Sequence, residues 1–536
     1  MSTQFSKREL TAGLGVGALA LLAQTQRASA DTPFTTFPFA ATGAPTPRTM
    51  PDRLGEIKNV KDYGAVGDGV TNDTAAIQSC FDAAFGTAAQ PNGGGNVGLS
   101  PNHPYLNKAV YFPPGHYKVG APAALTVTAT ANNGGNTKCT VGSTSGWSKN
   151  WIVDISGGTG GLANGSFGIV SIDDATHLTI TQAFTSTGTG TIKTAALHLT
   201  GVYSGMIYGA GRNNTVIETL DTTTSTAVIS TNQMSDTTWY DLAFKGNADI
   251  NNLATTGQVG FDYNWDGRSL GGNGSQTNSW VGCRFENIGN PSIGFRAGNG
   301  QAQCDSCSFF GCWFAGKTLG AAGGIGFACM NFNSLNHCFY GGQFASHDVH
   351  IKVLGGSVSV ISGCEMQGSN TFAIDLGNEG AVLATVVEGI RTEDLNFITC
   401  ANTACQLLVL GCTQAGANTT TFVFSRCATT IMNCTSEAGN IQGGNSSAFT
   451  VAVINSIQGV GTLTEMPITF GTANRILHWP VRATVFTDLP SSPKEGMTAN
   501  ITDATVNTFG ANVTVGGGAN HVKIRHNGTN WTVCGI

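Results

Sequence analysis

Four acidic residues in the second half of the chain have the types and spacing for acid–base chemistry: Glu365, Glu388, Glu393 and Asp394. Two carboxyl groups that flank a glycosidic bond can act as acid and as nucleophile or base, at separations of about 5 Å or about 6.5–9.5 Å. Protonation of a leaving group also needs a carboxyl whose pKa is raised, for example by burial. These four residues are therefore the candidate catalytic set.

Cationic and aromatic side chains that can hold a sugar chain accompany the acids. An indole ring can stack on a sugar, and a guanidinium can bind a carboxylate through two parallel hydrogen bonds. The candidates for substrate binding are Arg284, Trp313, Arg391, Asp266 and Arg268. The alternative is that the first three lie on an ordinary solvated surface and that the last two belong to a turn-rich connection.

A repeat along the chain predicts which of these side chains share a surface. Short apolar segments recur every 22–30 residues and align without gaps on Cys283, Cys312, Gly342, Cys364, Glu388, Cys412 and Cys434. A second strand per repeat is indicated at Phe295, Phe327, Ile351, Ile374, Phe424 and Val451. This is the period of a solenoid built coil by coil, here predicted between about residues 275 and 460.

Alternation along each strand sorts the side chains into inward and outward columns. The aligned cysteines are predicted to face inward and to pack as small hydrophobes, with a disulfide between Cys412 and Cys434 as the alternative. The positions two residues earlier, such as Val281, Phe310 and Tyr340, are predicted to face inward as well. Arg284, Trp313, Glu365 and Arg391 are then expected on one exposed strip.

Glu388 is the exception, because strict alignment puts its carboxyl in the inward column, where an unpaired charge is costly. Three interpretations stay open. The register shifts and Glu388 points outward, or Glu388 is buried and paired, or it is a partly buried acid with a raised pKa.

Composition excludes several classes of protein. Charged residues make up 11% of the 536 residues, less than half the usual share, and the net charge is −6 without a basic cluster, which argues against nucleic-acid binding. A hydrophobic share of 41% allows a packed core.

The N-terminus has the pattern of an export signal over residues 1–30. Lys7 and Arg8 precede a short apolar run, and Ala28-Ser29-Ala30 is a small-residue cleavage pattern. The run is too short to span a membrane. We expect a secreted or periplasmic protein that starts near Asp31, exported by a signal that is similar to the twin-arginine type with Lys7 in place of the first arginine. The alternative is a mildly apolar helix that is kept in the mature protein.

Three stretches nearer the N-terminus form a specific set: Asn59–Gln78, which contains Tyr63-Gly64-Ala65-Val66-Gly67-Asp68-Gly69, then Val110–Tyr117 and Met206–Ile217. The first predicts a strand, a Gly/Asp turn and a helix over roughly residues 74–86, capped by Asp73 or Thr74. Together they resemble the N-terminal end of the pectate lyase superfamily, specifically its rhamnogalacturonase/epimerase-like branch, over about residues 56–220. The resemblance implies an all-β fold, a single-stranded right-handed parallel β-helix, in an exported protein that handles polysaccharide.

The catalytic motifs of that superfamily do not transfer to this chain. Asp173-Asp174 and Lys523-Ile524-Arg525 look like pieces of the polygalacturonase set but lie outside the predicted β-helix. The Arg-x-Pro-x-x-Arg pattern of calcium-dependent pectate lyases is missing. The resemblance therefore implies a fold and export, without a pectin substrate.

The predicted organisation has six parts. Residues 1–30 are the export signal, 31–55 a lead-in, 56–123 the N-terminal cap and first coils, 124–194 a small inserted β domain, 195–478 the main β-helix and 479–536 a small C-terminal β module.

Two functions compete, and sugar epimerase or transferase chemistry on the same fold is the remaining alternative. The first is a polysaccharide-degrading glycoside hydrolase or lyase that acts in a groove of the β-helix, without a metal or cofactor, or with calcium in the case of a lyase. The second is a non-catalytic carbohydrate-binding or surface protein, including one derived from a phage tail. In both cases the expected partner is a polysaccharide, with no nucleic acid and no transmembrane segment, and a homotrimer is a candidate assembly.

Overall fold

The computed structural model describes residues 55–86, 109–220, 225–246, 258–265, 275–286, 293–298, 304–316, 324–331, 334–377, 384–416, 419–443, 450–459 and 483–535, with short strands at 38–39, 48–49, 464–465, 468–469 and 475–478. The chain divides into two compact units, Met1–Lys58 and Asn59–Ile536. In the first unit, β1 (Pro38–Phe39) pairs antiparallel with β2 (Arg48–Thr49). The predicted export signal lies outside the described residues. None of the helices in the described ranges has the length and apolar character needed to cross a membrane.

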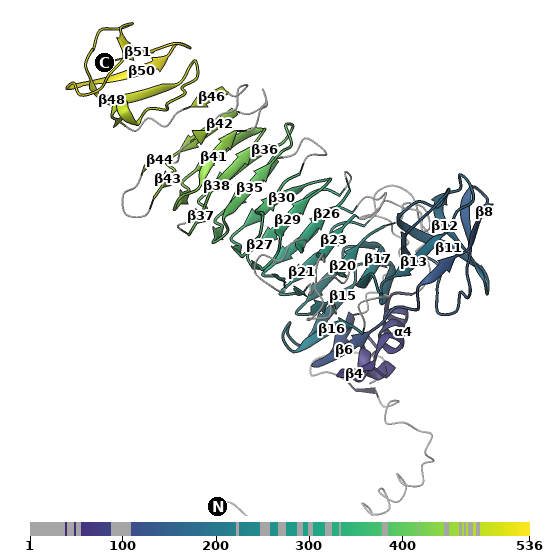
Figure 1. Cartoon of the computed structure of the whole chain (residues 1–536). Coiled ribbons are helices and arrows are strands. Elements are labelled where there is room, and N and C mark those ends of the chain that lie inside the picture. Colours follow the sequence, from purple (N-terminus) through teal and green to yellow (C-terminus); the bar gives the residue numbers. More distant parts are fainter. Residues whose placement is uncertain are drawn as a thin grey trace, which may run out of the picture. The chain divides into compact units, whose positions relative to one another are not determined.

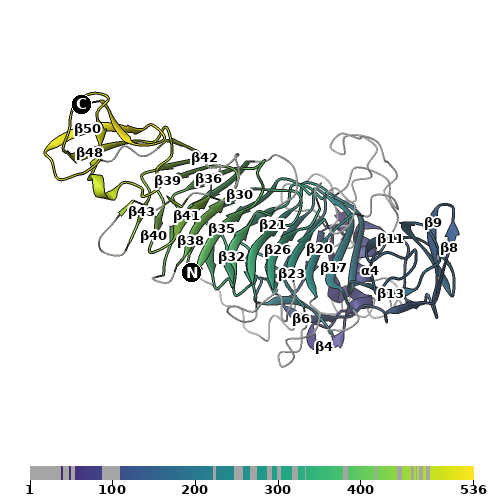
Figure 2. The same cartoon turned by 45° about the horizontal axis from the view of Figure 1, so that its top comes forward.

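The main body of the second unit is a right-handed parallel β-helix, as the sequence indicated, whose chain passes repeatedly through three sheets (Figures 1 and 2). Sheet 1 contains β14 (Leu197–Tyr203), β17 (Ala227–Ser235), β20 (Val259–Tyr263), β23 (Ile293–Ala297), β26 (Ile325–Cys329), β29 (Val349–Val353), β32 (Phe372–Asp375), β35 (Asn396–Cys400), β38 (Thr421–Ser425), β41 (Asn440–Gly443) and β45 (Ile468–Thr469). Sheet 2 contains β3 (Ile57–Asn59), β5 (Ala109–Phe112), β15 (Met206–Gly209), β18 (Thr238–Tyr240), β21 (Ser279–Val281), β24 (Ser308–Phe310), β27 (His337–Tyr340), β30 (Val358–Ser362), β33 (Ala384–Glu388), β36 (Gln406–Leu410), β39 (Ala428–Met432), β42 (Thr450–Ile454) and β46 (Arg475–His478). Sheet 3 contains β4 (Asp68–Asn72), β6 (Gly115–Val119), β16 (Thr215–Thr219), β19 (Ala243–Lys245), β22 (Arg284–Glu286), β25 (Trp313–Ala315), β28 (Gln343–Ala345), β31 (Glu365–Gln367), β34 (Arg391–Thr392), β37 (Thr413–Gln414), β40 (Thr435–Ser436), β43 (Ile457–Gln458) and β44 (Thr464–Glu465).

A sharp corner joins sheet 2 to sheet 3 in the coils from β18–β19 to β42–β43, and it corrects one prediction. The segment around each aligned cysteine is not one strand but two, separated by a residue in the left-handed conformation, such as Gly282 (φ 62°) or Asn433 (φ 54°). Because this residue interrupts the alternation, the position before the corner faces outward. Phe310 and Tyr340, predicted to be buried, are 41% and 39% exposed.

The core consists of in-register ladders of apolar side chains. Cys283, Cys312, Cys364, Cys412 and Cys434 are buried, as predicted. None of the fifteen cysteines, all of which lie in the described ranges, forms a disulfide. Beside them, the Phe285 and Phe314 rings stack at 4.9 Å, and those of Phe314 and Phe344 at 4.5 Å. Such stacks stabilise neighbouring coils beyond the burial of apolar area.

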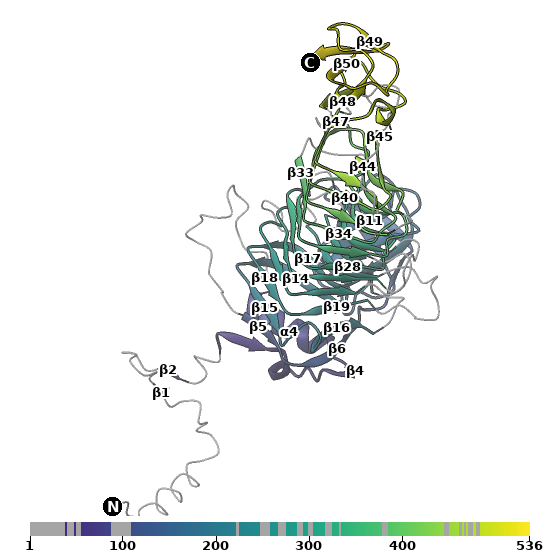
Figure 3. The same ribbon diagram turned by 90° about the vertical axis from the view of Figure 1, so that its left-hand side faces the viewer.

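The first coils are covered by η2 (Val60–Tyr63) and by α4 (Thr74–Phe85), the helix that the sequence predicted (Figure 3). Asp73 is the N-cap residue, as predicted, but its side chain makes no capping bond to the helix. Its buried carboxylate accepts hydrogen bonds from the backbone N–H groups of Val66 (2.7 Å) and Gly67 (3.1 Å) instead. Asp73 thus holds the Gly/Asp turn of the first motif.

Two further sheets lie outside the three sheets of the β-helix, one inserted in the chain between β6 and β14 and one after β46. Residues 125–194 form a seven-stranded antiparallel sheet with its own apolar core, made of β7 (Leu125–Val127), β8 (Ala129–Asn133), β9 (Asn136–Thr140), β10 (Ile152–Ser156), β11 (Gly165–Asp174), β12 (His177–Ala183) and β13 (Gly190–Thr194). Near the C-terminus, a five-stranded sheet contains β47 (Ala483–Thr484), β48 (Thr498–Ala504), β49 (Asn512–Val513), β50 (Asn520–His526) and β51 (Trp531–Gly535), with η3 (Phe486–Asp488) after its first strand.

Candidate functional site

An outward column on sheet 3 brings together four of the nine candidate residues, namely Arg284, Trp313, Glu365 and Arg391. Strand register aligns Arg284, Trp313, Gln343, Glu365, Arg391 and Thr413 on six successive coils. Neighbouring coils repeat about every 4.8 Å, the distance between hydrogen-bonded strands. The strip predicted from the sequence therefore exists, and we call this column the sheet 3 strip.

Arg391 is the centre of an ion network on this strip. Its guanidinium Nη1 lies 3.2 Å from Glu365 Oε1 and its Nη2 lies 2.5 Å from Glu393 Oε1. The three side chains are 54%, 48% and 46% exposed for Arg391, Glu365 and Glu393. The network presents one cation and two carboxylates to solvent, so it can donate hydrogen bonds to a ligand and accept them.

Arg284 and Trp313 form a second contact on the strip. The Arg284 guanidinium carbon lies 4.0 Å from the centre of the Trp313 ring, a cation–π arrangement. Arg284 also forms an ion pair with Glu286 and donates a hydrogen bond to Asn213 Oδ1 at 3.4 Å. One face of the half-buried indole is therefore occupied, and only its other face can meet a sugar ring.

Sheet 2 carries an outward aromatic column that sequence reasoning missed. Register aligns Tyr111, Tyr208, Tyr240, Val281, Phe310 and Tyr340. The Tyr111 and Tyr208 rings stack at 5.0 Å, and those of Phe310 and Tyr340 at 5.1 Å. Stacked rings cover each other's faces, so this column offers ring edges to solvent. Aromatic residues directly before the corner residue were the available signal.

Glu388 continues the sheet 2 column and faces outward. It aligns with Ser362 on one side and Leu410 on the other, while Val387 is buried. The corner residue of this coil is Gly389 (φ 60°), and Ile390 fills the inward position that the sequence alignment gave to Glu388. The alternative in which the register shifts is therefore correct, and the alternative with an inward, paired carboxyl is wrong.

Asp394 lies inside the β-helix rather than on the strip. It is 1% exposed, accepts a hydrogen bond from Thr392 Oγ1 at 2.7 Å and lies 3.3 Å from His350 Nε2. Burial would raise the pKa of Asp394, but the bonds from His350, Ser369 and Thr392 lower it overall. An enclosed, hydrogen-bonded carboxylate cannot reach a polysaccharide, so Asp394 leaves the catalytic set.

Asp266 and Arg268 lie outside the described residues. Asp262, in the same stretch, is buried in an ion pair with Arg296, whose Nε lies 2.9 Å from Asp262 Oδ1. The same guanidinium reaches Asp154 of β10, with Nη2 3.2 Å from Oδ2. The residues on β20 and β23 thus hold the antiparallel sheet against the outward face of sheet 1.

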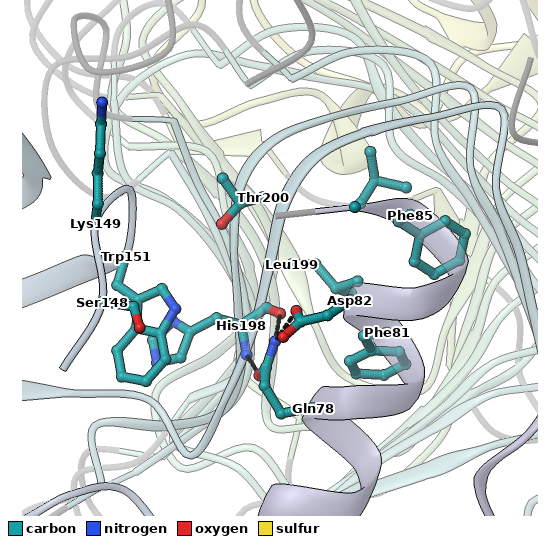
Figure 4. A pocket seen from close by; sticks show the side chains of 12 residues that line it. Gln78, Phe81, Asp82, Phe85, Ser148, Lys149, Trp151, His198, Leu199 and Thr200 are labelled. Atoms are coloured by element: carbon teal, nitrogen blue, oxygen red, sulfur yellow. Dashed lines mark hydrogen bonds between the residues drawn. The ribbon is translucent and has the colours of Figure 1, made fainter. Parts of the chain in front are cut away.

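A cleft of about 120 Å³ opens between α4, β14 and the segment before β10 (Figure 4). Its walls include Asp82, Lys149, Trp151 and His198. The Trp151 and His198 rings stack at 3.8 Å, and Gln78 bridges α4 to β14 through bonds of 2.9 Å to the backbone of His198. Burial raises the pKa of Asp82 and lowers that of His198 to about 3. Sequence reasoning did not find this cleft, since its walls come from three separate segments.

Carboxylates do not form a metal site in the described ranges. The group whose ligand atoms approach one another closely enough consists of Cys400, Cys405 and Cys427. Calcium binding, which the sequence tied to a lyase, stays a prediction.

Comparison with protein families matches residues 57–202 to the family described as rhamnogalacturonase A/epimerase, pectate lyase-like. The resemblance to the pectate lyase superfamily is confirmed. The match includes the Gly/Asp turn held by Asp73 and ends within β14, so the pectate lyase-like part lies before the sheet 3 strip.

Two curated relatives match short stretches of the chain. Plasmin and fibronectin-binding protein A of Streptococcus pneumoniae is 46% identical over 80 residues, 15% of this chain and 10% of the relative. Mannuronan C5-epimerase AlgE5 of Azotobacter vinelandii is 46% identical over 61 residues, which are 11% of this chain and 4% of the relative. The chain therefore spans a tenth or less of the length of these relatives.

Solved structures with a similar course of the chain include three β-helix proteins. The A-module of mannuronan C-5 epimerase AlgE6 from Azotobacter vinelandii covers 78% of this chain and 99% of its own, at 16% identity and a TM-score of 0.35. ORF18 of Geobacillus virus E2 covers 90% of this chain and 77% of its own, at 12% identity and a TM-score of 0.43. PfbA, a surface adhesin of Streptococcus pneumoniae, covers 89% of this chain and 98% of its own, at 12% identity and a TM-score of 0.35.

Proposed function

We propose that this protein binds a polysaccharide along the sheet 3 strip. A polysaccharide is a chain of repeating units, and successive coils offer equivalent positions about every 4.8 Å. A flexible polymer laid across the coils can thus meet Trp313, Gln343, Glu365 and Arg391 in turn. The pectate lyase-like sequence of residues 57–202 supports a carbohydrate as the ligand class.

The half-exposed network of Glu365, Arg391 and Glu393 is the observation that carries the proposal. Charge-assisted hydrogen bonds are the stronger ones, and sugar hydroxyls can both donate to the carboxylates and accept from the guanidinium. The network is already ordered by its internal ion pairs, which reduces the entropy lost when a ligand binds.

Binding fits this geometry better than hydrolysis does. A glycoside hydrolase needs two carboxyl groups that face the bond to be cleaved. Glu365 and Glu393 both face the same guanidinium instead, and Asp394 is enclosed in the core.

Hydrolysis is nevertheless the second candidate, favoured by the fact that one guanidinium holds both carboxylates. If a substrate carboxylate or hydroxyl displaced Arg391, Glu365 and Glu393 would lie on either side of the position that the guanidinium leaves.

We also propose that the intact protein is exported to the periplasm or the medium and that it assembles as a homotrimer.

A screen of purified protein against neutral and acidic polysaccharides tests the proposal. Mannuronan belongs in the panel, since the names of several relatives contain it. Affinity electrophoresis measures binding, while reducing ends and absorbance of unsaturated sugars, with and without calcium, measure cleavage. Binding without cleavage supports the proposal, and reducing ends without absorbance favour the hydrolase. Absorbance would indicate a lyase, and a protein that neither binds nor cleaves any member of the panel would contradict the proposal.

A further inference from the structure

Three cysteine side chains from two successive coils converge at the turn that joins sheet 1 to sheet 2. Cys400 ends β35, Cys405 precedes β36, and Cys427 lies between β38 and β39 of the next coil. All three sulfur atoms lie within 4.8 Å of one another, and the Sγ atoms of Cys400 and Cys427 are 3.6 Å apart.

These distances suit a cation bound by three thiolates. A metal–sulfur bond of about 2.3 Å separates the sulfur atoms of a three- or four-coordinate site by about 4 Å. The observed sulfur separations, 3.6 Å between Cys400 and Cys427 and at most 4.8 Å within the group, lie close to that spacing.

Hydroxyl groups around Cys427 favour a thiolate there. The Ser425 Oγ lies 3.3 Å and the Thr429 Oγ1 3.8 Å from its sulfur. A thiolate is the form of cysteine that binds metals.

The three cysteines differ in the exposure of the whole residue. Cys400 and Cys427 are fully buried, whereas Cys405 is partly exposed at the surface of the turn. By contrast, Cys304, Cys307 and Cys329 are all fully buried.

We propose that Cys400, Cys405 and Cys427 form a binding site for a soft monovalent cation, Cu(I). Thiolates select soft metals such as Cu(I) and zinc. Structural zinc sites almost always have four protein ligands, and among the described residues no fourth cysteine, histidine or carboxylate joins the group. Three sulfur ligands therefore fit Cu(I) better. This site is independent of polysaccharide binding.

Competition for Cu(I) against a chromogenic chelator, with the reduced full chain and without oxygen, tests the proposal. We expect one Cu(I) per chain to be taken from the chelator. Cys405→Ser should weaken binding by more than about 100-fold, because even the loss of an outer-shell partner of a metal costs up to that factor. Cys338→Ser is the matched control, since Cys338 is also partly exposed, and it should bind as the wild type does.

X-ray absorption of the copper-loaded wild type provides a readout that needs no variant, and three sulfur neighbours are expected. The proposal is overturned if the chain takes no Cu(I), if Cys405→Ser binds as tightly as the wild type, or if the metal has only two sulfur neighbours. Uptake of zinc without Cu(I), or isolation of the protein with a Cys400–Cys427 disulfide, would overturn it as well.

Discussion

Two sites in this protein place one arginine between two carboxylates, and they lie in opposite environments. In the exposed trio, Arg391 bridges Glu365 and Glu393, and about half of each side chain is open to solvent. In the buried trio, Arg296 bridges Asp262 and Asp154, with side chains that are 12%, 2% and 24% exposed.

The difference separates a binding surface from a structural joint. Exposed ion pairs contribute little to folding, so the exposed trio is available for a ligand at small cost. The charged groups of the buried trio are largely removed from water, so the loss of one partner would leave a buried charge without compensation. The buried trio joins β20 and β23 to β10, and so covers the part of sheet 1 nearest the N-terminus.

Removal of the buried arginine should have the largest effect. Arg296→Ala leaves the Asp262 carboxylate buried without its cation, and we expect a loss of about 3–5 kcal/mol in the free energy of unfolding. Urea unfolding of the two proteins measures the difference. Arg391→Ala is the matched control and should cost less than about 1 kcal/mol. Equal losses in the two variants would remove the distinction between the trios.

The contact between β14 and Trp151 should also make the protein sensitive to acid, through His198. Burial lowers the pKa of His198, on β14 against Trp151, to about 3. The unfolded chain binds a proton below a pKa of about 6.5, whereas the folded protein does not, so stability falls as the pH drops from about 6.5 towards 3. The expected slope from this residue is about 1.4 kcal/mol per pH unit within that window.

Unfolding measured between pH 7 and pH 4 tests the expectation. His198→Gln should flatten the slope by that amount, and His521→Gln, a change at an exposed histidine of the C-terminal sheet, should not. An unchanged slope in His198→Gln would argue against a neutral buried imidazole.

The smallest effect is expected inside the exposed trio. A double-mutant cycle with Glu365→Gln and Arg391→Ala should give a coupling of about 0.2–1 kcal/mol. At 1 M salt the coupling should nearly vanish, because the screening length falls to about 3 Å. A coupling that persists in salt would mean that this trio is less open than its exposure indicates.

The fold was largely predictable from local sequence. The Asn59–Gln78 motif predicted the helix that the structure places at Thr74–Phe85, and the recurring cysteines predicted an inward column. These features could be predicted because each depends on a few neighbouring residues or on a repeated spacing along the chain.

The site was less predictable, since it depends on where each coil turns. A left-handed residue such as Gly389 interrupts the inward–outward alternation of side chains, and the apolar pattern of the sequence does not show where this happens. The sequence therefore predicted the wrong side for Phe310 and Tyr340 and an inward alignment for Glu388. The enclosure of Asp394 depends on His350, two coils earlier. The three-cysteine group likewise comes from two coils, without a short spacing motif.

Binding of a polysaccharide by Arg391→Ala tests the central claim most directly. With the ligand that the wild type binds most tightly in the screen, the account predicts at least about a tenfold weaker affinity, equivalent to 1.4 kcal/mol, because Arg391 is the cation of the ion network that contacts the polysaccharide. Arg525→Ala, which removes an exposed arginine from β50, should bind as the wild type does. Unchanged affinity in Arg391→Ala, or an equal loss in both variants, would contradict a binding site on the sheet 3 strip.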